Sequence, residues 1–427
     1  MSDLRKMAVS GKLDDVFAEL YGGDPSAVGR QRQRYVDLLE EFAREFSDSP
    51  CVELFSVPGR TEVGGNHTDH NAGRILAGAV DLDIVAAAAK NPDGVIRIRT
   101  DEYPDVDVQV DDHNFIEDEY FSPSALARGV CARMTQLGYA VGGFDACTTS
   151  SVPEGSGLSS SAAFEVLIAT ILNHEYNGGS IDAITIAQIA QFAENNYFGK
   201  PCGLMDQTTC SVGGLVTIDF EDFEDPGVKK VDFDFGSSGF SVVIVNTGGS
   251  HADLHHDYIA LEHEMKDVAR ALGGDVLRRF SRGEVMAKIP YLRGEVSDRA
   301  ILRALHFYDD DQRVVDQVSA LESNDFEAFL NLIIESGVSS WMLCQNCYSC
   351  TNVAEQGLSV ALAASESILK GKGAWRVHGG GFAGTIQAFV PQDLLGEYVD
   401  HLQAIFGEDS CHQLMIRPVG ATRLDVG

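Results

Sequence analysis

The spacing of apolar side chains changes along the chain between a period typical of helices and one typical of strands. In residues 31–46 the apolar side chains recur at helical spacing, which predicts an amphipathic helix. Residues 95–100 and 106–110 alternate apolar and polar side chains, as antiparallel strands do. The apolar run Val52–Val57 predicts a strand that ends in a turn at Pro58-Gly59.

The same reading places further elements along the chain. Helices are expected over residues 162–175, 182–198, 251–272 and 353–369. Strands are expected over residues 144–153, 240–246, 375–378 and 385–390. The apolar stretch 75–89 fits either type of element. Strands and helices mix without strict alternation, which favours an α+β fold. Asp222–Gly227 is the expected surface crossing between two halves, 1–222 and 223–427.

Composition excludes several classes of partner. The chain has 427 residues, 32 basic and 64 acidic, and a formal net charge of −32. Its 44% apolar and 22% charged residues are typical of a globular protein. At roughly 100–200 residues per domain, this length predicts two or three domains. Nucleic acids and anionic membranes attract basic proteins, so we expect neither as a partner.

The cellular setting follows from segments that the sequence lacks. The first residues are charged and lack the apolar core of a signal peptide. No segment reaches the roughly 18 uninterrupted apolar residues of a membrane helix. The nine cysteines, an odd number, do not suggest a disulfide framework. We therefore expect a reduced, cytoplasmic protein that is a monomer or a weak homo-oligomer.

Residues 151–163, SVPEGSGLSSSAA, place glycines and serines just before a predicted helix. Glycine lets a backbone approach a ligand closely, and the free N–H groups at a helix start attract anions. The segment is therefore a candidate phosphate cradle. An ordinary strand–turn–helix with serine caps explains it about equally well. It is not a Walker A loop, because no Gly-Lys-[Ser/Thr] closes it.

A second glycine segment, His378–Gly384, formally matches G-x-G-x-x-G. A dinucleotide-binding fold requires a helix after that motif, whereas residues 385–390 alternate as a strand does. A tight glycine hairpin is therefore the favoured interpretation, and a dinucleotide-dependent oxidoreductase is disfavoured.

A third segment, residues 58–70, reads PGRTEVGGNHTDH and is dense in chemically active side chains, namely Arg60, Glu62, His67, Asp69 and His70. Such density in a loop suggests a functional site. The two histidines could begin a metal site, but no third ligand is apparent.

Together with residues 201–207, these segments resemble the motifs of one enzyme family. The signature PGRVNLIGEHTDY of galactokinases corresponds to residues 58–70, and the family motif PxGxGLSSSA corresponds to PEGSGLSSSA. GGGFGG corresponds to GGGFAG at 379–384, and PCGIMDQ to PCGLMDQ at 201–207. All four occur in the family's order. The chain thus resembles the galactokinase branch of the galactokinase, homoserine kinase, mevalonate kinase and phosphomevalonate kinase (GHMP) family.

The resemblance implies roles at matching positions. Asp206 matches the catalytic aspartate and Arg60 its partner, while Ser161 and Glu194 match ligands of the magnesium ion that bridges the nucleotide phosphates. The segment that wraps those phosphates corresponds to Pro153, Gly155, Gly157, Leu158, Ser159, Ser160 and Ser161. Sugar-contacting positions correspond to Asn66, His67, Asp69, Gly203 and Tyr258.

The resemblance also implies an activity and a fold. The enzyme would use ATP and Mg²⁺ to phosphorylate the anomeric (C1) hydroxyl of a hexose, with D-galactose the favoured substrate. The implied fold is a two-domain α+β kinase fold. An N-terminal domain (1–222) would carry the sugar and phosphate motifs, and a ferredoxin-like C-terminal domain (223–427) the third glycine motif, with the active site between them. An anomeric hydroxyl needs a carboxylate to accept its proton, and Asp206 would serve if Arg60 keeps it ionised.

The first motif departs from the family signature. Asn66 stands where the family has glutamate, Glu62 where it has asparagine, and His70 where it has tyrosine. The family glutamate contacts a hydroxyl far from the reacting carbon, so the reacting end of the sugar site looks kept and the far end changed. A kinase for a related hexose, an amino sugar or a uronic sugar is therefore an alternative. A non-catalytic sugar or nucleotide sensor is another.

Three cysteines, Cys344, Cys347 and Cys350, are spaced as metal ligands can be. A complete site needs a fourth ligand, which the sequence does not identify. Structural thiols are therefore the favoured interpretation.

Overall fold

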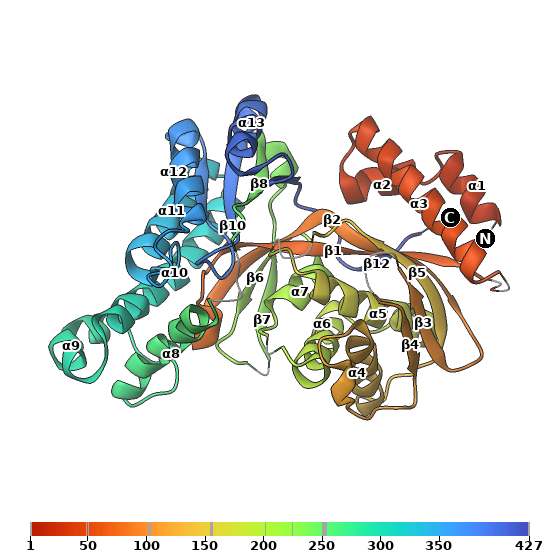
Figure 1. Ribbon diagram of the computed structural model, residues 1–427, viewed down its shortest axis with the longest axis horizontal. Helices are drawn as coiled ribbons and strands as arrows, with labels where there is room; N and C mark the ends of the chain where they lie inside the picture. The colour runs from red at the N-terminus through yellow and green to blue at the C-terminus, as the bar shows by residue number, and fades with distance from the viewer. Residues whose placement is uncertain are drawn as a thin grey trace.

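Two β-sheets carry the fold of this computed structural model, which describes residues 2–47, 49, 51–100, 104–153, 157–200, 202–223, 225–249 and 254–425 (Figure 1). The larger sheet has the strand order β12-β1-β2-β5-β3-β4, with β6 paired to β2 and β7 to β6. Its strands are β1 (Glu53–Gly64), β2 (Arg74–Lys90), β3 (Val95–Arg99), β4 (Val106–Gln109), β5 (Phe144–Ser150), β6 (Leu215–Asp219), β7 (Gly227–Val231) and β12 (Thr422–Arg423). The smaller sheet consists of β8 (Phe240–Asn246), β9 (Ala374–Val377), β10 (Thr385–Pro391) and β11 (Cys411–Leu414).

Helices cover both faces of the larger sheet. In Figure 1 one face carries α4 (Pro123–Gln136), α5 (Ser160–Asn177), α6 (Ala183–Ala193) and α7 (Met205–Val212), and the other carries α1 (Ser2–Val9), α2 (Asp14–Tyr21) and α3 (Pro25–Glu45). The second half adds α8 (His255–Ala271), α9 (Arg282–Glu295), α10 (Asp298–Glu322), α11 (Phe326–Ser339), α12 (Gly357–Leu369) and α13 (Leu395–Phe406). The mixture of sheets and helices confirms the predicted α+β class.

The apolar stretch that the sequence left undecided is strand β2. It pairs with β1, β5 and β6, so it lies in the middle of the larger sheet. Helices on both faces bury most of its side chains, including the run Ala86–Ala89. A strand buried on both faces reads as a continuous apolar run without alternation, which explains why periodicity alone did not decide.

The predicted turn at Pro58-Gly59 is wrong, because β1 continues through both residues to Gly64. The pairing of β1 with β2 shifts register between Pro58 and Arg60, so a bulge absorbs the irregularity. A Cβ atom on Gly59 would lie 2.7 Å from the carbonyl oxygen of Leu158. Glycine is therefore needed here for a close approach of the serine-rich loop, and it does not mark a turn.

The smaller sheet has the order β11-β8-β10-β9, and all of its pairs are antiparallel. Numbered along the chain, this order is 4-1-3-2. Helices connect β8 to β9 and β10 to β11, whereas β9 and β10 form a hairpin. This β-α-β-β-α-β arrangement is ferredoxin-like, as the family resemblance implied. The glycine segment 379–384 is the loop of the β9–β10 hairpin, so the hairpin interpretation is confirmed.

The segment 222–227 does not cross between the two sheets. Strand β7 pairs antiparallel with β6, so this segment joins two strands of the larger sheet. The chain passes to the smaller sheet between Val231 and Phe240. It later returns, because β12 pairs with β1. The division into 1–222 and 223–427 stays a prediction, and these sheet memberships favour a boundary between Val231 and Phe240.

The expected helices lie close to their predicted positions. The predicted helix 182–198 ends as an α-helix at Ala193 and continues as the π-helical turn η3 (Glu194–Phe198). Helix α12 begins at Gly357, four positions after the expected start. Of the expected helix 251–272, the first three residues lie outside the described part of the chain. No described helix is both long and apolar enough to span a membrane.

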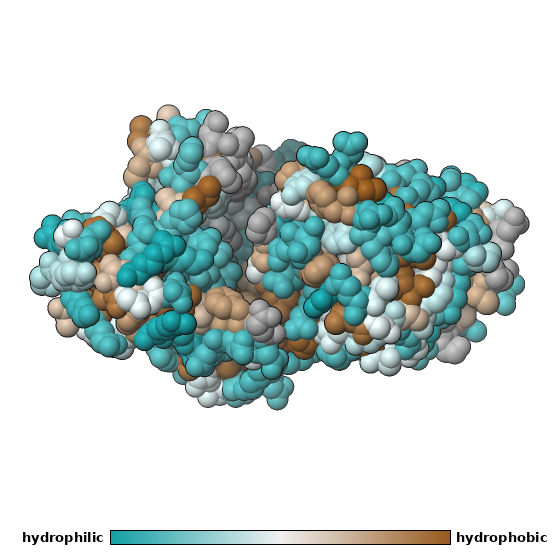
Figure 2. All heavy atoms as spheres, turned by 90° about the horizontal axis from the view of Figure 1, so that it is seen from below, coloured by the Kyte–Doolittle hydropathy of each residue, from teal (hydrophilic) through white to brown (hydrophobic). Residues whose placement is uncertain are grey.

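The outer surface is mostly polar. Figure 2 shows hydrophilic residues over most of the face seen from below, with a hollow between the two halves of the molecule.

Candidate functional site

The predicted catalytic residues meet as a bidentate ion pair. Arg60 of β1 donates from Nε and Nη2 to the two carboxylate oxygens of Asp206, at 2.7 and 2.8 Å. Asp206 lies in the first turn of α7, where the helix dipole favours a negative charge. Burial alone would raise the pKa of Asp206, but Arg60 and the Ser159 hydroxyl outweigh it and hold that pKa below its usual range. The carboxylate is therefore ionised at neutral pH.

Hydrogen bonds hold the serine-rich loop against this ion pair. The Ser159 hydroxyl donates to Asp206, and Arg60 donates from Nη1 to the carbonyl of Gly157. The Arg60 N–H also donates to the carbonyl of Leu158, at 3.0 Å. Gly157 has φ of 73°, a conformation that favours glycine. The loop thus presents its backbone and the start of α5 beside Asp206.

The members of the predicted phosphate segment differ in their placement. Leu158 is fully buried, so only its backbone can face a ligand. Ser160 begins α5, and its side chain is partly exposed. Pro153 precedes the loop, and residues 154–156, which follow it, lie outside the described part of the chain. Gly155 lies outside the described residues, so its predicted role is not tested.

The predicted metal ligands Ser161 and Glu194 lie together. The Ser161 hydroxyl donates to Oε1 of Glu194, at 3.0 Å. Gln207 donates to the other oxygen, Oε2, at 2.8 Å, and Lys200 lies 3.5 Å from Oε1. A hydroxyl and a carboxylate are the hard oxygen ligands that Mg²⁺ prefers, and Mg²⁺ commonly takes few protein ligands beside phosphate oxygens. The residues present therefore fit the ion.

A second buried carboxyl group, that of Glu165, lies near Glu194. Glu165 of α5 is fully buried, and Gln207 donates to its Oε1 at 2.7 Å. Burial, with Glu194 nearby, raises the pKa of Glu165 well above its usual value. Gln207 therefore holds two carboxyl groups in fixed positions next to Asp206, the predicted catalytic residue. The sequence reading missed both roles, although Gln207 closes the motif at 201–207.

Three of the predicted sugar contacts lie against other motifs of the chain. A Cβ atom on Gly203 would lie 3.2 Å from Oδ2 of Asp69, so the first and fourth motifs adjoin. His67 donates from Nε2 to the carbonyl of Gly380, at 2.9 Å. Burial, with His70 beside it, lowers the pKa of His67 to about 4, so the ring is neutral at pH 7.

Tyr258 approaches the same glycine loop from α8. Its hydroxyl donates to the carbonyl of Gly381, at 2.7 Å, and a Cβ atom on Gly380 would lie 2.6 Å from its ring. The hairpin loop of the smaller sheet therefore contacts residues from the first motif and from α8. This places the candidate site between the two sheets.

Asn66 is not placed as a sugar contact. Its side chain is fully buried and takes part in four hydrogen bonds, to Glu62, Gly379, Ser340 and Asn346. An amide has two donor hydrogens and two acceptor lone pairs, so these bonds use its whole capacity. The arrangement counts against the predicted contact of Asn66 with substrate.

Several polar residues of this network carry no local signal in the sequence. Arg376 of β9 is fully buried, donates to Glu62 at 2.8 Å and also donates to the carbonyl of Val63 at 2.6 Å. His306 and Asp310 of α10 bond the backbone of Asn66 at 2.9 and 2.7 Å. Together they hold the first motif against the second half of the chain.

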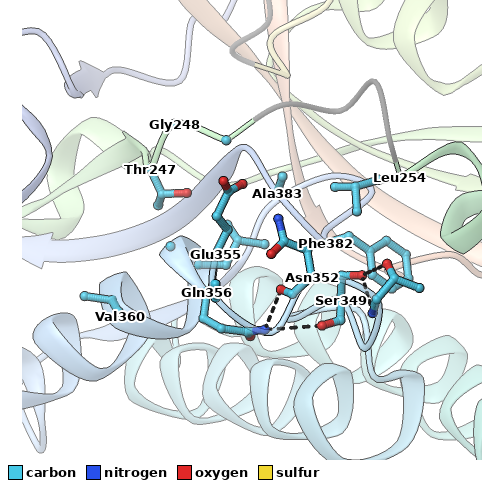
Figure 3. Close-up of a pocket in the computed structure, with 15 residues that line it drawn as sticks. Thr247, Gly248, Leu254, Ser349, Asn352, Glu355, Gln356, Val360, Phe382 and Ala383 are labelled. Atoms are coloured by element: carbon cyan, nitrogen blue, oxygen red, sulfur yellow. Dashed lines mark hydrogen bonds between the residues drawn. The ribbon is translucent and has the colours of Figure 1, made fainter.

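A separate cavity of about 1080 Å³ opens between the end of β8 and the start of α12 (Figure 3). Phe382 lines it, and the ring of Phe382 packs against Tyr258 with 5.3 Å between centroids. Among the described residues, its lining includes no predicted catalytic or phosphate-binding side chain. The cavity is thus distinct from the Arg60–Asp206 pair.

Cys344 and Cys347 are buried and Cys350 is exposed. Burial raises the pKa of the Cys344 thiol, and that of Cys347 to about 12. Both thiols are therefore protonated at neutral pH. Within the described ranges, no group of three or more His, Cys, Asp or Glu side chains could hold a metal ion.

Comparison with known proteins gives a consistent set of relatives. A family model described as GHMP kinases N terminal domain matches residues 125–214, and one described as galactokinase galactose-binding signature matches residues 40–90. The chain is 29% identical over 335 residues to a galactokinase of Streptomyces coelicolor, covering 78% of each sequence.

Solved structures share the fold. The structure of Lactococcus lactis galactokinase complexed with galactose matches with a TM-score of 0.76 and 22% identity, over 90% of this chain and 98% of that one. Methanococcus jannaschii mevalonate kinase matches with a TM-score of 0.60 and 14% identity, over 86% and 98%. At this identity the structural matches support the fold.

Proposed function

Because this chain belongs to the galactokinase branch of the GHMP kinases, we propose that it transfers the γ-phosphoryl group of ATP to the C1 hydroxyl of D-galactose. The observation that carries the proposal is the ionised Asp206, held by Arg60 and bonded to the serine-rich loop. The galactose-binding signature over residues 40–90 favours galactose as the sugar.

The proposed chemistry follows from these residues. The C1 oxygen attacks the γ-phosphorus, the bond from that phosphorus to the β–γ bridging oxygen breaks, and ADP leaves. Asp206 accepts the proton of the C1 hydroxyl. Arg60 stabilises negative charge on the transferred group while keeping Asp206 ionised. Phosphoryl transfer depends mainly on such positioning and charge stabilisation.

The nucleotide phosphates would lie at the start of α5. The backbone of residues 157–161 and the helix dipole supply donors for an anion. Lys200 and Arg60 add positive charge locally, which an acidic protein needs in order to bind ATP. Ser161 and Glu194 would hold Mg²⁺, which, when bound, neutralises phosphate charge.

The sugar would lie between the first motif and the glycine hairpin loop. We assign hydroxyl contacts to His67, Asp69, Gly203 and Tyr258. The bonds of His67 and Tyr258 to the glycine loop, and the approach of Gly203 to Asp69, support this assignment. We also propose that the chain forms an N-terminal domain (1–222) and a C-terminal domain (223–427). We expect the protein to be a cytoplasmic monomer or weak homo-oligomer. The net charge of −32 supports the absence of nucleic-acid and membrane partners.

A sugar panel at fixed ATP and magnesium tests the proposal. ADP release should be fastest, measured as kcat/KM, with galactose among galactose, glucose, galactosamine and galacturonate. Absence of turnover with every sugar, from folded protein that binds ATP, would refute the kinase function. A higher kcat/KM with galactosamine or galacturonate would refute galactose as the substrate.

A further inference from the structure

Glu62 and Asn66 exchange an acid and an amide relative to the galactokinase signature. The signature has asparagine at the position of Glu62 and glutamate at the position of Asn66. In this structure the two side chains are bonded to each other, since Asn66 Nδ2 donates to Glu62 Oε1 at 3.1 Å. This corner of the site therefore keeps one carboxylate and one amide, with their positions interchanged.

The amide of Asn66 is fully occupied by the protein. Nδ2 also donates to the carbonyl of Gly379 at 2.8 Å. Oδ1 accepts from Asn346 at 2.8 Å and from Ser340 at 3.3 Å. A substrate hydroxyl could bond Asn66 only by displacing one of these buried partners, which would leave that partner unsatisfied at a cost.

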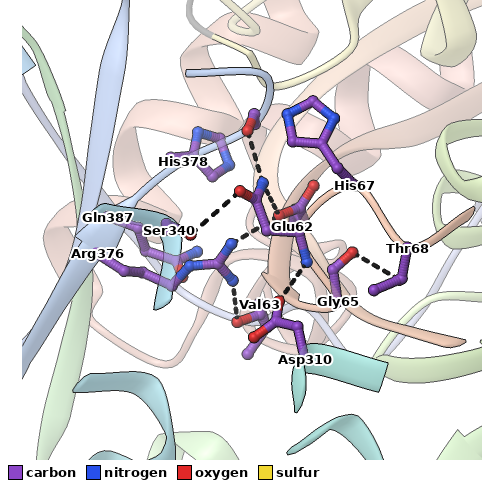
Figure 4. Close-up of polar contacts among 12 residues, drawn as sticks. Glu62, Val63, Gly65, His67, Thr68, Asp310, Ser340, Arg376, His378 and Gln387 are labelled. Atoms are coloured by element: carbon purple, nitrogen blue, oxygen red, sulfur yellow. Dashed lines mark hydrogen bonds and ion pairs between the residues drawn. The ribbon is translucent and has the colours of Figure 1, made fainter. Parts of the chain in front are cut away.

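The carboxylate of Glu62 is only half occupied. Oε1 accepts from both Asn66 and Arg376. Oε2 has no hydrogen-bond partner among the described residues, and 9% of the side chain is exposed. In Figure 4 the carboxylate lies on the side of the network that faces His67. One oxygen is thus left for a ligand beside a predicted sugar contact.

The strand geometry places Glu62 on the same side of β1 as Arg60. Residues two apart on a strand share a face, so Glu62 and Arg60 of β1 lie on the same side. Burial raises the pKa of Glu62, and the fully buried guanidinium of Arg376 opposes that rise by favouring the charged form. A carboxylate maintained in this way, with one free oxygen, is a ready acceptor for a hydroxyl.

We propose that Glu62, in place of Asn66, supplies the carboxylate at the far end of the sugar site, accepting a hydrogen bond from a hydroxyl remote from C1, while Asn66 and Arg376 hold it in position. This inference rests on the proposed function. Glu62 is then a sugar-binding residue that determines which hydroxyl pattern is accepted.

The variant Glu62→Gln tests the assignment, because it removes the charge and keeps the shape. A hydrogen bond to a charged group is strong enough that its loss should raise KM for galactose about 10- to 100-fold. The value of kcat should change much less, because the bond is remote from C1. Galactose analogues that each lack one hydroxyl then identify the partner.

The unmodified enzyme should penalise the loss of one hydroxyl, and Glu62→Gln should abolish that penalty while keeping the penalties for the other hydroxyls. Such coupling is the signature of a direct contact. If Glu62→Gln instead raises KM equally for all analogues, or lowers only the Tm, Glu62 is a structural partner of Arg376 and the inference is overturned.

A second variant guards against a folding defect. Glu62→Asn combined with Asn66→Glu rebuilds the family arrangement and should restore sensitivity to the same hydroxyl. Failure of this double variant to recover that sensitivity, in folded protein, also contradicts the inference. If the unmodified protein turns over no sugar, the proposed function fails first; if it turns over galactose, only the role of Glu62 is at stake.

Discussion

Replacing Asp206 by asparagine tests the core of the mechanism. The substitution keeps the size of the side chain but removes the proton acceptor. Asp206 now accepts from Arg60 at 2.7 and 2.8 Å and from Ser159. An asparagine can satisfy some of these donors but carries no charge. Arg60 keeps one further bond, to the carbonyl of Gly157.

The magnitude follows from what general base catalysis contributes. A positioned base accelerates a reaction by about 10²- to 10⁴-fold, which corresponds to about 2.7–5.4 kcal/mol at about 1.36 kcal/mol per tenfold. We expect kcat of Asp206→Asn to fall within that range, with KM for ATP nearly unchanged. Breaking a buried ion pair costs about 3–5 kcal/mol, and the remaining Arg60 bond and partial exposure of Asp206 should keep the loss of stability below that.

The assay is single-turnover formation of sugar phosphate at saturating galactose and ATP, with thermal unfolding to confirm the folded state. Asp219→Asn is a matched control, because Asp219 also pairs with two arginines, Arg74 at 2.8 Å and Arg278 at 3.0 Å. It should leave kcat unchanged. If Asp206→Asn keeps kcat within about tenfold of the unmodified protein, Asp206 is not the base and the sensor interpretation gains support.

Three further predictions concern metal binding, pH and stability. Glu194→Gln should raise the magnesium concentration for half-maximal activity at least about tenfold, because Ser161 alone remains as a proposed magnesium ligand. A magnesium titration of activity measures this change, and an unchanged requirement would contradict the assignment. Burial lowers the pKa of His378 to about 3, so the unfolded chain binds the extra proton and the free energy of unfolding should fall as pH drops from about 6.5 toward 3. Urea unfolding of His378→Asn should show a slope shallower by up to about 1.4 kcal/mol per pH unit, whereas identical slopes would exclude a buried neutral ring. Arg417→Met leaves the buried carboxylate of Asp83 without one of its cations and should lower the free energy of unfolding by about 3–5 kcal/mol, read from the denaturant midpoint with kcat per folded molecule unchanged.

Local patterns predicted those parts of the fold that local physics determines. The helix α3 and the β3–β4 and β9–β10 pairs follow from strong periodicity in the sequence. The turn at Pro58-Gly59 was wrong because a tertiary contact, the approach of the Leu158 carbonyl, explains the glycine. Here the packing of distant segments overrode a reliable local signal.

The candidate site likewise contains some residues that local motifs predict and others that they do not. Asp206 and Arg60 lie in motifs whose residue types show in the sequence. Arg376 could not be inferred, because its partner Glu62 lies 314 positions away and a lone arginine in a strand carries no signal. Asn66 was expected to contact the sugar by its position in the motif, and only the structure shows that Glu62 and three distant residues use all of its hydrogen-bonding capacity.

The return of the chain to the larger sheet has a consequence for the order of folding during synthesis. Strand β12 borders β1, and Arg417 is fully buried against Asp83 and Ser56. The ribosome makes these residues after the whole smaller sheet. The sheet that carries Arg60 therefore lacks an edge strand and a buried counter-charge until synthesis has passed residue 423. A nascent chain halted in the second half should expose that edge to chaperones.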